Sequence, residues 1–122
     1  MRYFLTALPL ALLATGCIPD SGRATRSTPE EYDNDGLVCL KKTISATNEN
    51  GILTIRGTVV NRRDTRLTYA EIRFTVCNSA GHQTGTAIAN INDLAPGAKW
   101  AFEAVTISPG DAKYSIASLS GF

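Results

Sequence analysis

The sequence has little of what most catalytic sites and nucleic-acid-binding surfaces use. It contains one histidine and three cysteines among 122 residues. Beyond Arg2 there are 11 basic residues, and the 11 acidic residues balance them, so residues 17–122 carry no excess of either charge. Proteins that bind DNA or RNA usually have a marked basic excess. We therefore expect no nucleic-acid partner.

Motifs for common reactions are also missing. No G-x-S-x-G, phosphate-loop or H-E-x-x-H pattern occurs. The single His82 follows Gly81 in an expected turn, and one histidine cannot complete a zinc site alone. The run 33–36 (DNDG) loosely resembles a calcium loop, but the later glutamate that such a loop requires is absent. We predict no metal site, no cofactor and no enzymatic activity, with an enzyme as the least favoured alternative.

No apolar run reaches the roughly 20 residues that a membrane-spanning helix needs. Residues 1–16 instead place Arg2 before a shorter apolar stretch, Tyr3–Ala14, which is interrupted by Thr6 and Pro9. A positive start followed by a short apolar stretch is typical of a secretory signal peptide. We predict that residues 1–16 are such a signal.

Cys17 ends a segment, 13–17 (LATGC), that resembles the bacterial lipobox, although Ala14 stands where leucine is usual. The resemblance implies cleavage before Cys17 and a diacylglyceryl thioether on its sulfur, a modification that anchors a protein to a membrane. Because Ile18 replaces the aspartate that retains lipoproteins in the inner membrane, the outer membrane, facing the periplasm, is favoured in a Gram-negative host. The alternative is an ordinary thiol at Cys17 in a signal peptide that is cut elsewhere.

The next segment has little to bury. Residues 17–36 are rich in serine, threonine, proline, glycine and charge. Such composition favours a flexible linker over a packed element. We predict a lipidated cysteine with a flexible tether over 17–36 and a single domain over 37–122.

From Leu37 onward, short β-rich runs alternate with turn residues and show no helical period. Regularly spaced strands of this kind predict an antiparallel β-sandwich or barrel. The expected strands are Leu37–Thr47, Ile52–Asn61, Leu67–Asn78, Thr84–Leu94, Lys99–Ile107 and Lys113–Leu119. Apolar residues alternate with polar ones in three of them, which indicates one buried and one solvated face. Trp100 and Phe102 fall on the buried face, with an exposed aromatic anchor as the alternative.

Three segments carry a family resemblance over residues 51–105. They are 57–61 (GTVVN), 74–81 (FTVCNSAG) and 94–102 (LAPGAKWAF). In order and spacing they resemble the FxLYD domain, an immunoglobulin-like β-sandwich of bacterial and archaeal lipoproteins. Val76, Cys77 and Asn78 depart from the leucine, tyrosine and aspartate of the family pattern. The resemblance implies an all-β, immunoglobulin-like antiparallel β-sandwich preceded by a lipoprotein signal peptide and tether.

With Cys17 lipidated, Cys39 and Cys77 remain as an even pair in an exported chain. The alternation of their strands places both on solvent-facing positions. We therefore predict a Cys39–Cys77 disulfide, worth roughly 4 kcal/mol for a loop of this length. The alternatives are an unpaired or intermolecular thiol, and a catalytic thiol.

Five arginines form the candidate contact patch: Arg56, Arg62, Arg63, Arg66 and Arg73. Anionic headgroups or a partner's carboxylates could dock there. The alternative is a solvated loop, partly neutralised by nearby acidic residues.

Together these features predict an extracytoplasmic lipoprotein that acts as a non-catalytic binding or assembly module. Its expected partners are the membrane, through the lipid anchor, and an envelope protein whose identity the sequence does not specify. The alternative function is a structural lipoprotein that stabilises the envelope, or an exclusion lipoprotein that occupies a receptor.

Overall fold

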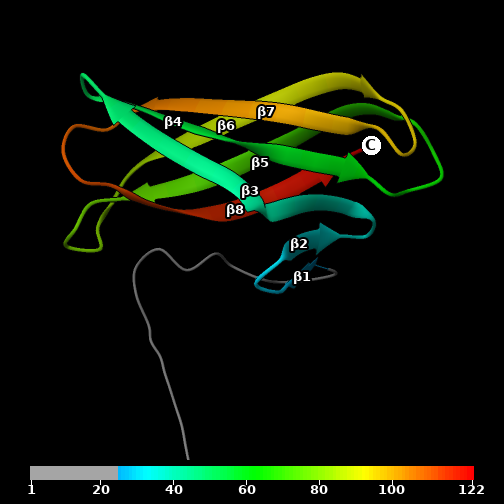
Figure 1. The fold of residues 1–122 in the computed structure, drawn as a ribbon, viewed down its shortest axis with the longest axis horizontal. Helices are drawn as coiled ribbons and strands as arrows, with labels where there is room; N and C mark the ends of the chain where they lie inside the picture. Colours follow the sequence, from blue (N-terminus) through cyan, green and yellow to red (C-terminus); the bar gives the residue numbers. More distant parts are fainter. Residues whose placement is uncertain (1–24) are drawn as a thin grey trace, which may run out of the picture.

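The computed structural model describes residues 25–122, which form eight β-strands and, within that range, no helix (Figure 1). The predicted signal peptide over residues 1–16, and Cys17, lie outside the described residues. The strands are β1 (Thr25–Ser27), β2 (Glu31–Asn34), β3 (Leu37–Glu49), β4 (Ile52–Asn61), β5 (Leu67–Cys77), β6 (Gln83–Leu94), β7 (Lys99–Ile107) and β8 (Lys113–Gly121).

All neighbouring strands are antiparallel and belong to one sheet with the order β1-β2-β3-β4-β7-β6-β5-β8. The junction between β7 and β6 has only one paired position, Ile88 opposite Val105. The sheet therefore curls into two layers, β2–β3–β4–β7 and β6–β5–β8, with a common core between them. The predicted all-β antiparallel architecture is confirmed, and its two layers belong to one curled sheet.

The six predicted strands correspond to β3 through β8, with ends that differ by one or two residues. The connection between β3 and β4 is a two-residue turn. Asn50 and Gly51 join β3 to β4 with φ angles of 55° and 78°, and Glu49 pairs with Ile52 across the turn. Positive φ at both central positions is the requirement of the two-residue hairpin turns that Asn-Gly favours.

The flexible tether predicted through Gly36 is wrong for residues 25–36. These residues form the β1–β2 hairpin, which adds to the edge of β3 (Figure 1). Tyr32 inserts into the core with 6% of its surface exposed. Asp35 and Gly36, with φ angles of 53° and 92°, form a second two-residue turn between β2 and β3. A buried aromatic residue and an Asp-Gly turn thus help to order a segment whose composition otherwise indicates a linker.

The core contains apolar residues from the inner face of both layers. Phe74 and Phe102 lie at its centre, with ring centroids 5.7 Å apart. Trp100 meets the edge of Phe102, with the centroids 6.0 Å apart. Trp100 and Phe102 are 7% and 2% exposed, so the prediction that they lie in the core is confirmed.

A bulge in β3 adjusts the sheet to this core. The pairing of β3 with β4 shifts between Leu40 and Ser45. The hydroxyl of Thr43 bridges the gap: it donates to the carbonyl of Leu40 at 2.6 Å and accepts from the amide of Thr58 at 2.9 Å. Opposite the bulge stands Gly57, where an added Cβ would lie 2.6 Å from the ring of Phe102. Only glycine leaves room for that ring.

Candidate functional site

A cavity of about 410 Å3 opens where the two edges of the curled sheet approach each other. Its volume falls within the range of small-ligand and peptide sites. One wall comes from β1, β2 and β3, and the other comes from β8, with one residue of β5 between them. The lining residues are Ser27, Tyr32, Lys41, Ile44, Phe74, Tyr114, Ser115 and Ile116. We call this cavity the β3–β8 groove.

The interior of the β3–β8 groove is apolar and aromatic. Phe74 and Ile116 belong to the buried core, and the ring of Tyr114 meets Phe74 edge-on at 6.0 Å. Ile44 packs against the same core while remaining partly exposed. An apolar floor that reaches into the core is suited to receive apolar side chains, because burial there removes them from water.

Polarity at the β3–β8 groove comes from its rim. The ammonium of Lys41 donates a 2.5 Å hydrogen bond to the hydroxyl of Ser27. Among the described lining residues, Lys41 is the one charged side chain, and no carboxylate accompanies it. The lining also lacks, within residues 25–122, a histidine or thiol beside a hydroxyl. The arrangement can therefore bind an apolar group with a neighbouring negative charge, and in its hydroxyl–ammonium contact Lys41 is the donor to Ser27.

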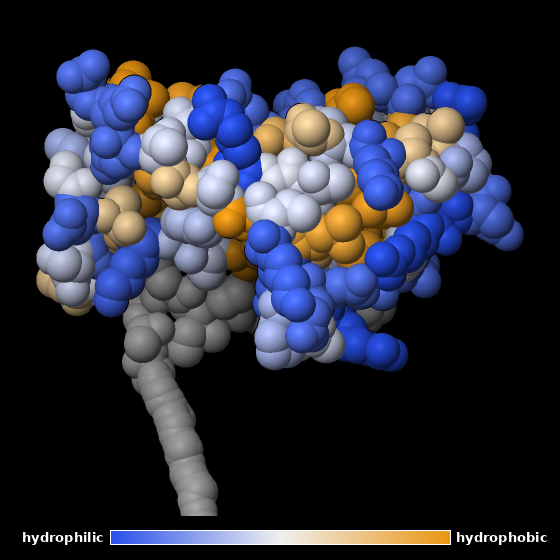
Figure 2. All heavy atoms as spheres, viewed as in Figure 1, coloured by the Kyte–Doolittle hydropathy of each residue, from blue (hydrophilic) through white to orange (hydrophobic). Residues whose placement is uncertain are grey.

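The exposed face of the molecule is mixed (Figure 2). Hydrophilic residues cover most of the face shown, with smaller hydrophobic areas between them. One exposed apolar row crosses the outer side of β4, β7 and β6, where Ile52 pairs with Ile107 and Val105 pairs with Ile88. These four side chains are 40–76% exposed. They form a second surface on which apolar contact is available.

The five arginines of the predicted contact patch do not form a free cationic surface. Four of them pair with carboxylates: Arg56 with Glu103, Arg62 with Glu31, Arg66 with Asp93, and Arg73 with Glu71. Their N–O distances are 2.7–3.0 Å. Since each positive charge has a negative neighbour, the field that would attract anionic headgroups is largely cancelled.

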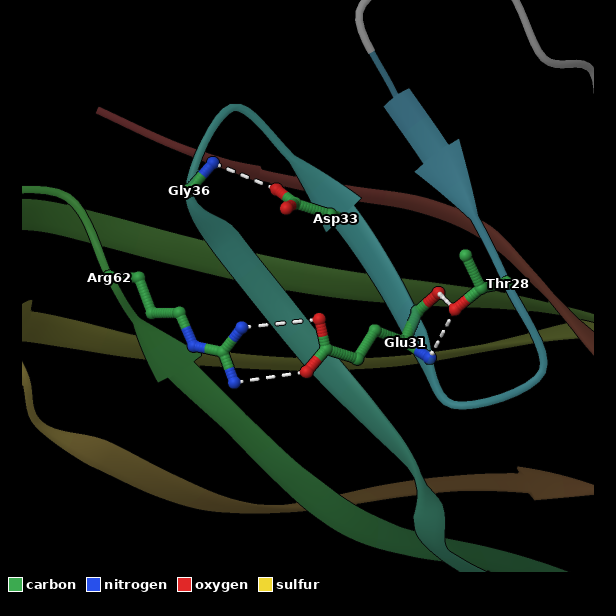
Figure 3. Close-up of polar contacts among 5 residues, drawn as sticks. All are labelled: Thr28, Glu31, Asp33, Gly36 and Arg62. Atoms are coloured by element: carbon green, nitrogen blue, oxygen red, sulfur yellow. Dashed lines mark hydrogen bonds and ion pairs between the residues drawn. The ribbon is translucent and has the colours of Figure 1, made fainter.

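Arg62 shows what such a pair does locally (Figure 3). Its guanidinium donates two hydrogen bonds to the carboxylate of Glu31, at 3.1 and 3.0 Å, and so ties β2 to the end of β4. Within the same hairpin, the amide of Glu31 donates to the hydroxyl of Thr28, and the amide of Gly36 donates to the carboxylate of Asp33. The segment that resembled a calcium loop is thus a hairpin turn stabilised by its own side chains.

Arg63 binds backbone carbonyls instead of a carboxylate. Its guanidinium donates to Asp35 at 2.9 Å, to Asn34 at 3.0 Å and to Gly121 at 3.1 Å. These acceptors lie in the β2–β3 turn and at the end of β8. Arg63 therefore holds three separate segments together, and its predicted role in docking is replaced by a structural one.

Asn61 closes the same end of the sheet from inside. It is fully buried, and its side-chain amide lies 3.0–3.2 Å from the carbonyls of Thr65, Leu94 and Ala95. Its side-chain oxygen accepts from the amide of Arg63 at 3.0 Å. Asn61 thereby joins the β4–β5 loop to the β6–β7 loop. We call the region held by Asn61 and Arg63 the clamped end.

The predicted Cys39–Cys77 disulfide is wrong, because Cys39 is a free thiol. Both sulfurs are buried, with the residues 0% and 1% exposed, which also contradicts the predicted solvent-facing positions. Cys39 lies on the inner face, opposite Val59 in the pairing of β3 with β4. The alternation predicted for the strand Leu37–Thr47 therefore placed Cys39 on the wrong face of the sheet.

Distance also prevents this bond. Cys77 pairs with Lys113 at the start of β8, whereas Leu37, close to Cys39, lies against Gly121 at the end of β8. A strand rises about 3.3 Å per residue, so the two cysteines are separated by on the order of 20 Å along the strand. A disulfide needs Cα atoms about 4–7 Å apart.

Burial gives Cys39 its chemical character. Desolvation raises the pKa of the Cys39 thiol to about 12, against a smaller opposing effect of Lys41. A thiol with so high a pKa is almost entirely protonated at neutral pH and is a poor nucleophile. Its role is packing within the inner face of the sheet.

A different titrating pair lies on the outer face of β5. The hydroxyl of Tyr69 donates to Glu71 at 2.8 Å, and Arg73 donates to the other carboxylate oxygen at 2.9 Å. The hydrogen bond from Tyr69 and then that from Arg73 lower the pKa of Glu71, and the bond to Glu71 raises the pKa of Tyr69. The ring of Tyr69 also contacts Phe122, with centroids 5.8 Å apart.

His82 occupies the β5–β6 turn, as expected, and is exposed. The amides of Ala80 and His82 both donate to the side chain of Asn78, which shapes this turn. Within residues 25–122, no group of three histidine, cysteine, aspartate or glutamate side chains is placed to hold a metal ion. The same part of the chain contains no helix that is long and apolar enough to cross a membrane.

Comparisons with known proteins give no further assignment: no family model, no curated protein and no solved structure matches this chain.

Sequence reasoning did not anticipate the β3–β8 groove. Lys41 and Ile44 lie some 70 residues before Tyr114 and Ile116, and they meet only because the sheet curls. The polar segment ahead of β3, interpreted as a tether, supplies Ser27 and Tyr32. The Asp-Gly pair at 35–36 between two extended segments was the available signal for that hairpin.

Proposed function

We propose that this protein is a lipid-anchored extracytoplasmic module that binds a partner through the β3–β8 groove and catalyses no reaction. The observation that carries the proposal is the groove itself: an apolar floor continuous with the core, one cationic side chain at the rim, and no histidine or cysteine among the described lining residues. A site of this composition provides affinity and orientation without chemistry.

The lipoprotein part of the proposal rests on the sequence. The segment 13–17 (LATGC) resembles a lipobox, and an anchor at Cys17 would place the domain a short distance from the membrane, which in a Gram-negative host is the outer membrane. The resemblance to FxLYD domains of lipoproteins agrees with this location. Two of its segments meet at the clamped end, where the amide of Gly97 donates to the carbonyl of Asn61 at 2.6 Å.

The anchor is tested by metabolic labelling with a radioactive fatty acid. Label should enter the wild-type protein and the Cys39→Ala control, and it should be lost from Cys17→Ala, which should also leave the membrane fraction. Equal labelling of Cys17→Ala would show that Cys17 is not the lipidated residue.

Partner binding is tested by photo-crosslinking in intact cells. A photoreactive phenylalanine analogue replaces Tyr114 in the groove, Val105 in the exposed apolar row, or Asn92 on the polar outer face of β6. We expect one defined crosslinked partner from position 114 and none from position 92. A partner captured from position 105 alone would move the binding surface to the apolar row.

The same crosslinking strains distinguish the second candidate function, a structural or exclusion lipoprotein, from partner binding through the groove. No crosslinked partner from any position, together with a fragile envelope in a deletion strain, would favour the structural role.

A further inference from the structure

We propose that the β3–β8 groove takes an extended peptide strand of a partner protein, which pairs with the part of the β3 edge that no strand of residues 25–122 covers and carries a negative charge at the end that meets Lys41. This inference deepens the proposed function, because it rests on the same groove and specifies the chemistry of the partner. Its basis is the edge of β3, the shape of the cavity beside that edge, and the charge at the rim.

The edge of β3 changes character along its length. Its first residues, Leu37 to Leu40, pair with β2 on one side and with β4 on the other. The last contact with the hairpin is the amide of Lys41, which donates to the carbonyl of Glu30 at 2.8 Å. After the bulge, β3 pairs with β4 again from Ser45 to Glu49, but from Lys42 to Glu49 no strand within residues 25–122 pairs with its other side.

Sheets prevent unwanted pairing by means of charged side chains, especially lysine, and by β-bulges, prolines or very short edges. Lys42, Glu49 and the bulge protect the two ends of this portion of β3 in that way, whereas the stretch between them does not carry a charge. Residues 44–47 (ISAT) contain no charge and no proline, and Ser45, Ala46 and Thr47 are exposed. Because β2 begins at Glu31, opposite Leu40, no strand within residues 25–122 covers this uncharged stretch on that side. An available edge of this kind is what strand addition uses.

The cavity lies directly beside this edge. Ile44 of β3 forms one side and Tyr114 and Ile116 of β8 form the other, with Phe74 below them. In a strand, alternate side chains point to the same face, so every second residue of an added peptide would enter the groove. The backbone hydrogen bonds would come from β3, and the selectivity for apolar side chains would come from the core residues that form the floor.

The charge of the rim sets the preferred end of the peptide. Lys41 is the only charged residue among the described lining residues, and its ammonium is held at the mouth by Ser27. A carboxylate on the incoming peptide would complement it, whereas a basic residue would be repelled. These properties together describe an extended peptide with alternating apolar residues and an acidic end.

The test uses the full-length protein, purified from membranes in detergent, and a soluble library of ten-residue peptides. Alternate positions are valine, isoleucine or leucine, the positions between them are serine or threonine, and one end carries two aspartates. Bound peptides are recovered and identified by mass spectrometry, and their affinities are measured by calorimetry. We expect a subset to bind and to slow amide hydrogen exchange of residues 44–48 by at least about tenfold.

Two manipulations separate strand addition from general adhesion. N-methylation of every second peptide amide should abolish binding in one register and leave it in the other, because only one row of amides faces β3. Lys41→Glu should weaken the affinity for the aspartate-ended peptides by about tenfold or more. The same variant should bind peptides in which two lysines replace the two aspartates. Lys99→Glu, a charge reversal on an exposed residue of β7, should change neither.

Several outcomes would overturn the proposal. Binding that is insensitive to N-methylation in both registers would show contact through side chains alone. Protection of residues 44–48 that depends on protein concentration without peptide would show that a second copy occupies the edge. Binding that requires removal of residues 18–24 would show that the chain fills its own groove. If no library member binds while position 114 still captures a partner in cells, the proposed binding function stands and the strand mode is wrong.

Discussion

The clamped end and the β3–β8 groove lie on the same curled sheet and are held together in opposite ways. At the clamped end, the side chains of buried Asn61 and half-buried Arg63 donate six hydrogen bonds to backbone carbonyls of four separate segments. At the groove, apolar side chains face a cavity, and Lys41 donates a hydrogen bond to Ser27 at the rim. One region is closed by its own polar contacts, and the other borders a cavity beside an edge of β3 that no strand of residues 25–122 covers. The difference indicates that stability is concentrated at one place and binding capacity at another.

The largest expected effect is at the centre of the clamped end. Asn61→Ala would leave three carbonyls and the amide of Arg63 without their side-chain partner in a fully buried position. Each unsatisfied buried group costs about 1–3 kcal/mol, so we expect the free energy of unfolding to fall by about 3 kcal/mol or more. Urea denaturation measures it, with the exposed Asn92→Ala as control. A loss no larger than that of the control would show that the clamped end does not depend on Asn61.

Arg63 and Arg62 provide a matched pair of adjacent arginines. Arg63→Ala removes three hydrogen bonds to backbone carbonyls, whereas Arg62→Ala removes a pair whose side chains are 49% and 33% exposed. We expect a loss of about 2 kcal/mol for Arg63→Ala and less than about 1 kcal/mol for Arg62→Ala. A higher salt concentration should diminish the stability loss of Arg62→Ala more than that of Arg63→Ala, because it screens the exposed ion pair. Thermal unfolding of both variants at two salt concentrations measures these losses. Equal losses of stability would contradict the different roles assigned to Arg63 and Arg62.

The thiol of Cys39 reports on the tightness of the clamped end. Because burial raises its pKa to about 12, alkylation at pH 8 should be far slower in the native protein than in urea. Since Arg63 holds the hairpin that packs against Cys39, Arg63→Ala should accelerate alkylation more than Lys41→Ala does, although Lys41 is the closer charge. Mass spectrometry of the alkylated Cys39 peptide gives the rates. Rapid alkylation of the native wild-type protein would show that this region opens readily.

Acid should weaken the outer face of β5 next to the clamped end. The pKa of Glu71 is lowered in the folded protein, so its contribution to stability is present above the ordinary glutamate pKa of about 4.3 and is lost as the pH falls through the lower folded value. Glu71→Gln should remove this part of the pH dependence and leave the remainder. Unfolding curves between about pH 2 and 6 show the difference between the two proteins. Parallel curves would mean that Tyr69 and Arg73 do not stabilise the carboxylate.

The smallest effect on stability is expected in the groove. Lys41→Ala removes one exposed hydrogen bond and should change the free energy of unfolding by less than about 0.5 kcal/mol. The same substitution should reduce binding of acidic peptides, because Lys41 is the charge at the rim. A stability loss as large as that of Arg63→Ala would erase the contrast between the two regions.

Much of the fold was predictable because strand periodicity is local. The alternation through Leu53 and Ile55, and the positions of Trp100 and Phe102, identified the buried face of β4 and β7 correctly. The first strand was assigned to the wrong face, since Leu37, Val38 and Cys39 are all buried and no alternation is visible there. The β1–β2 hairpin was missed because its composition is polar, its buried apolar residue Tyr32 is isolated in the sequence, and its polar partners Arg62 and Arg63 lie about 30 residues later.

The candidate site was much less predictable than the fold. The predicted arginine patch was selected by charge type and nearness in sequence, whereas charge cancellation by Glu31, Glu71, Asp93 and Glu103 depends on which strands are neighbours. The predicted disulfide relied on cysteine number, and cysteine number does not specify distance. In both cases the sequence supplied the residue types, and the sheet order determined their partners.

By itself, the sequence determined the all-β class, the positions of six strands and the turns between them, because hydrophobic alternation and Asn-Gly or Pro-Gly pairs act over a few residues. Only the tertiary structure decided that Cys39 lies far from Cys77, that Arg63 binds carbonyls of the chain itself, and that β3 and β8 border a groove. These features depend on residues far apart in the sequence, such as Arg63 and its acceptors at separations of 28, 29 and 58 positions, and such contacts arise from the curl of the whole sheet, which no local pattern encodes.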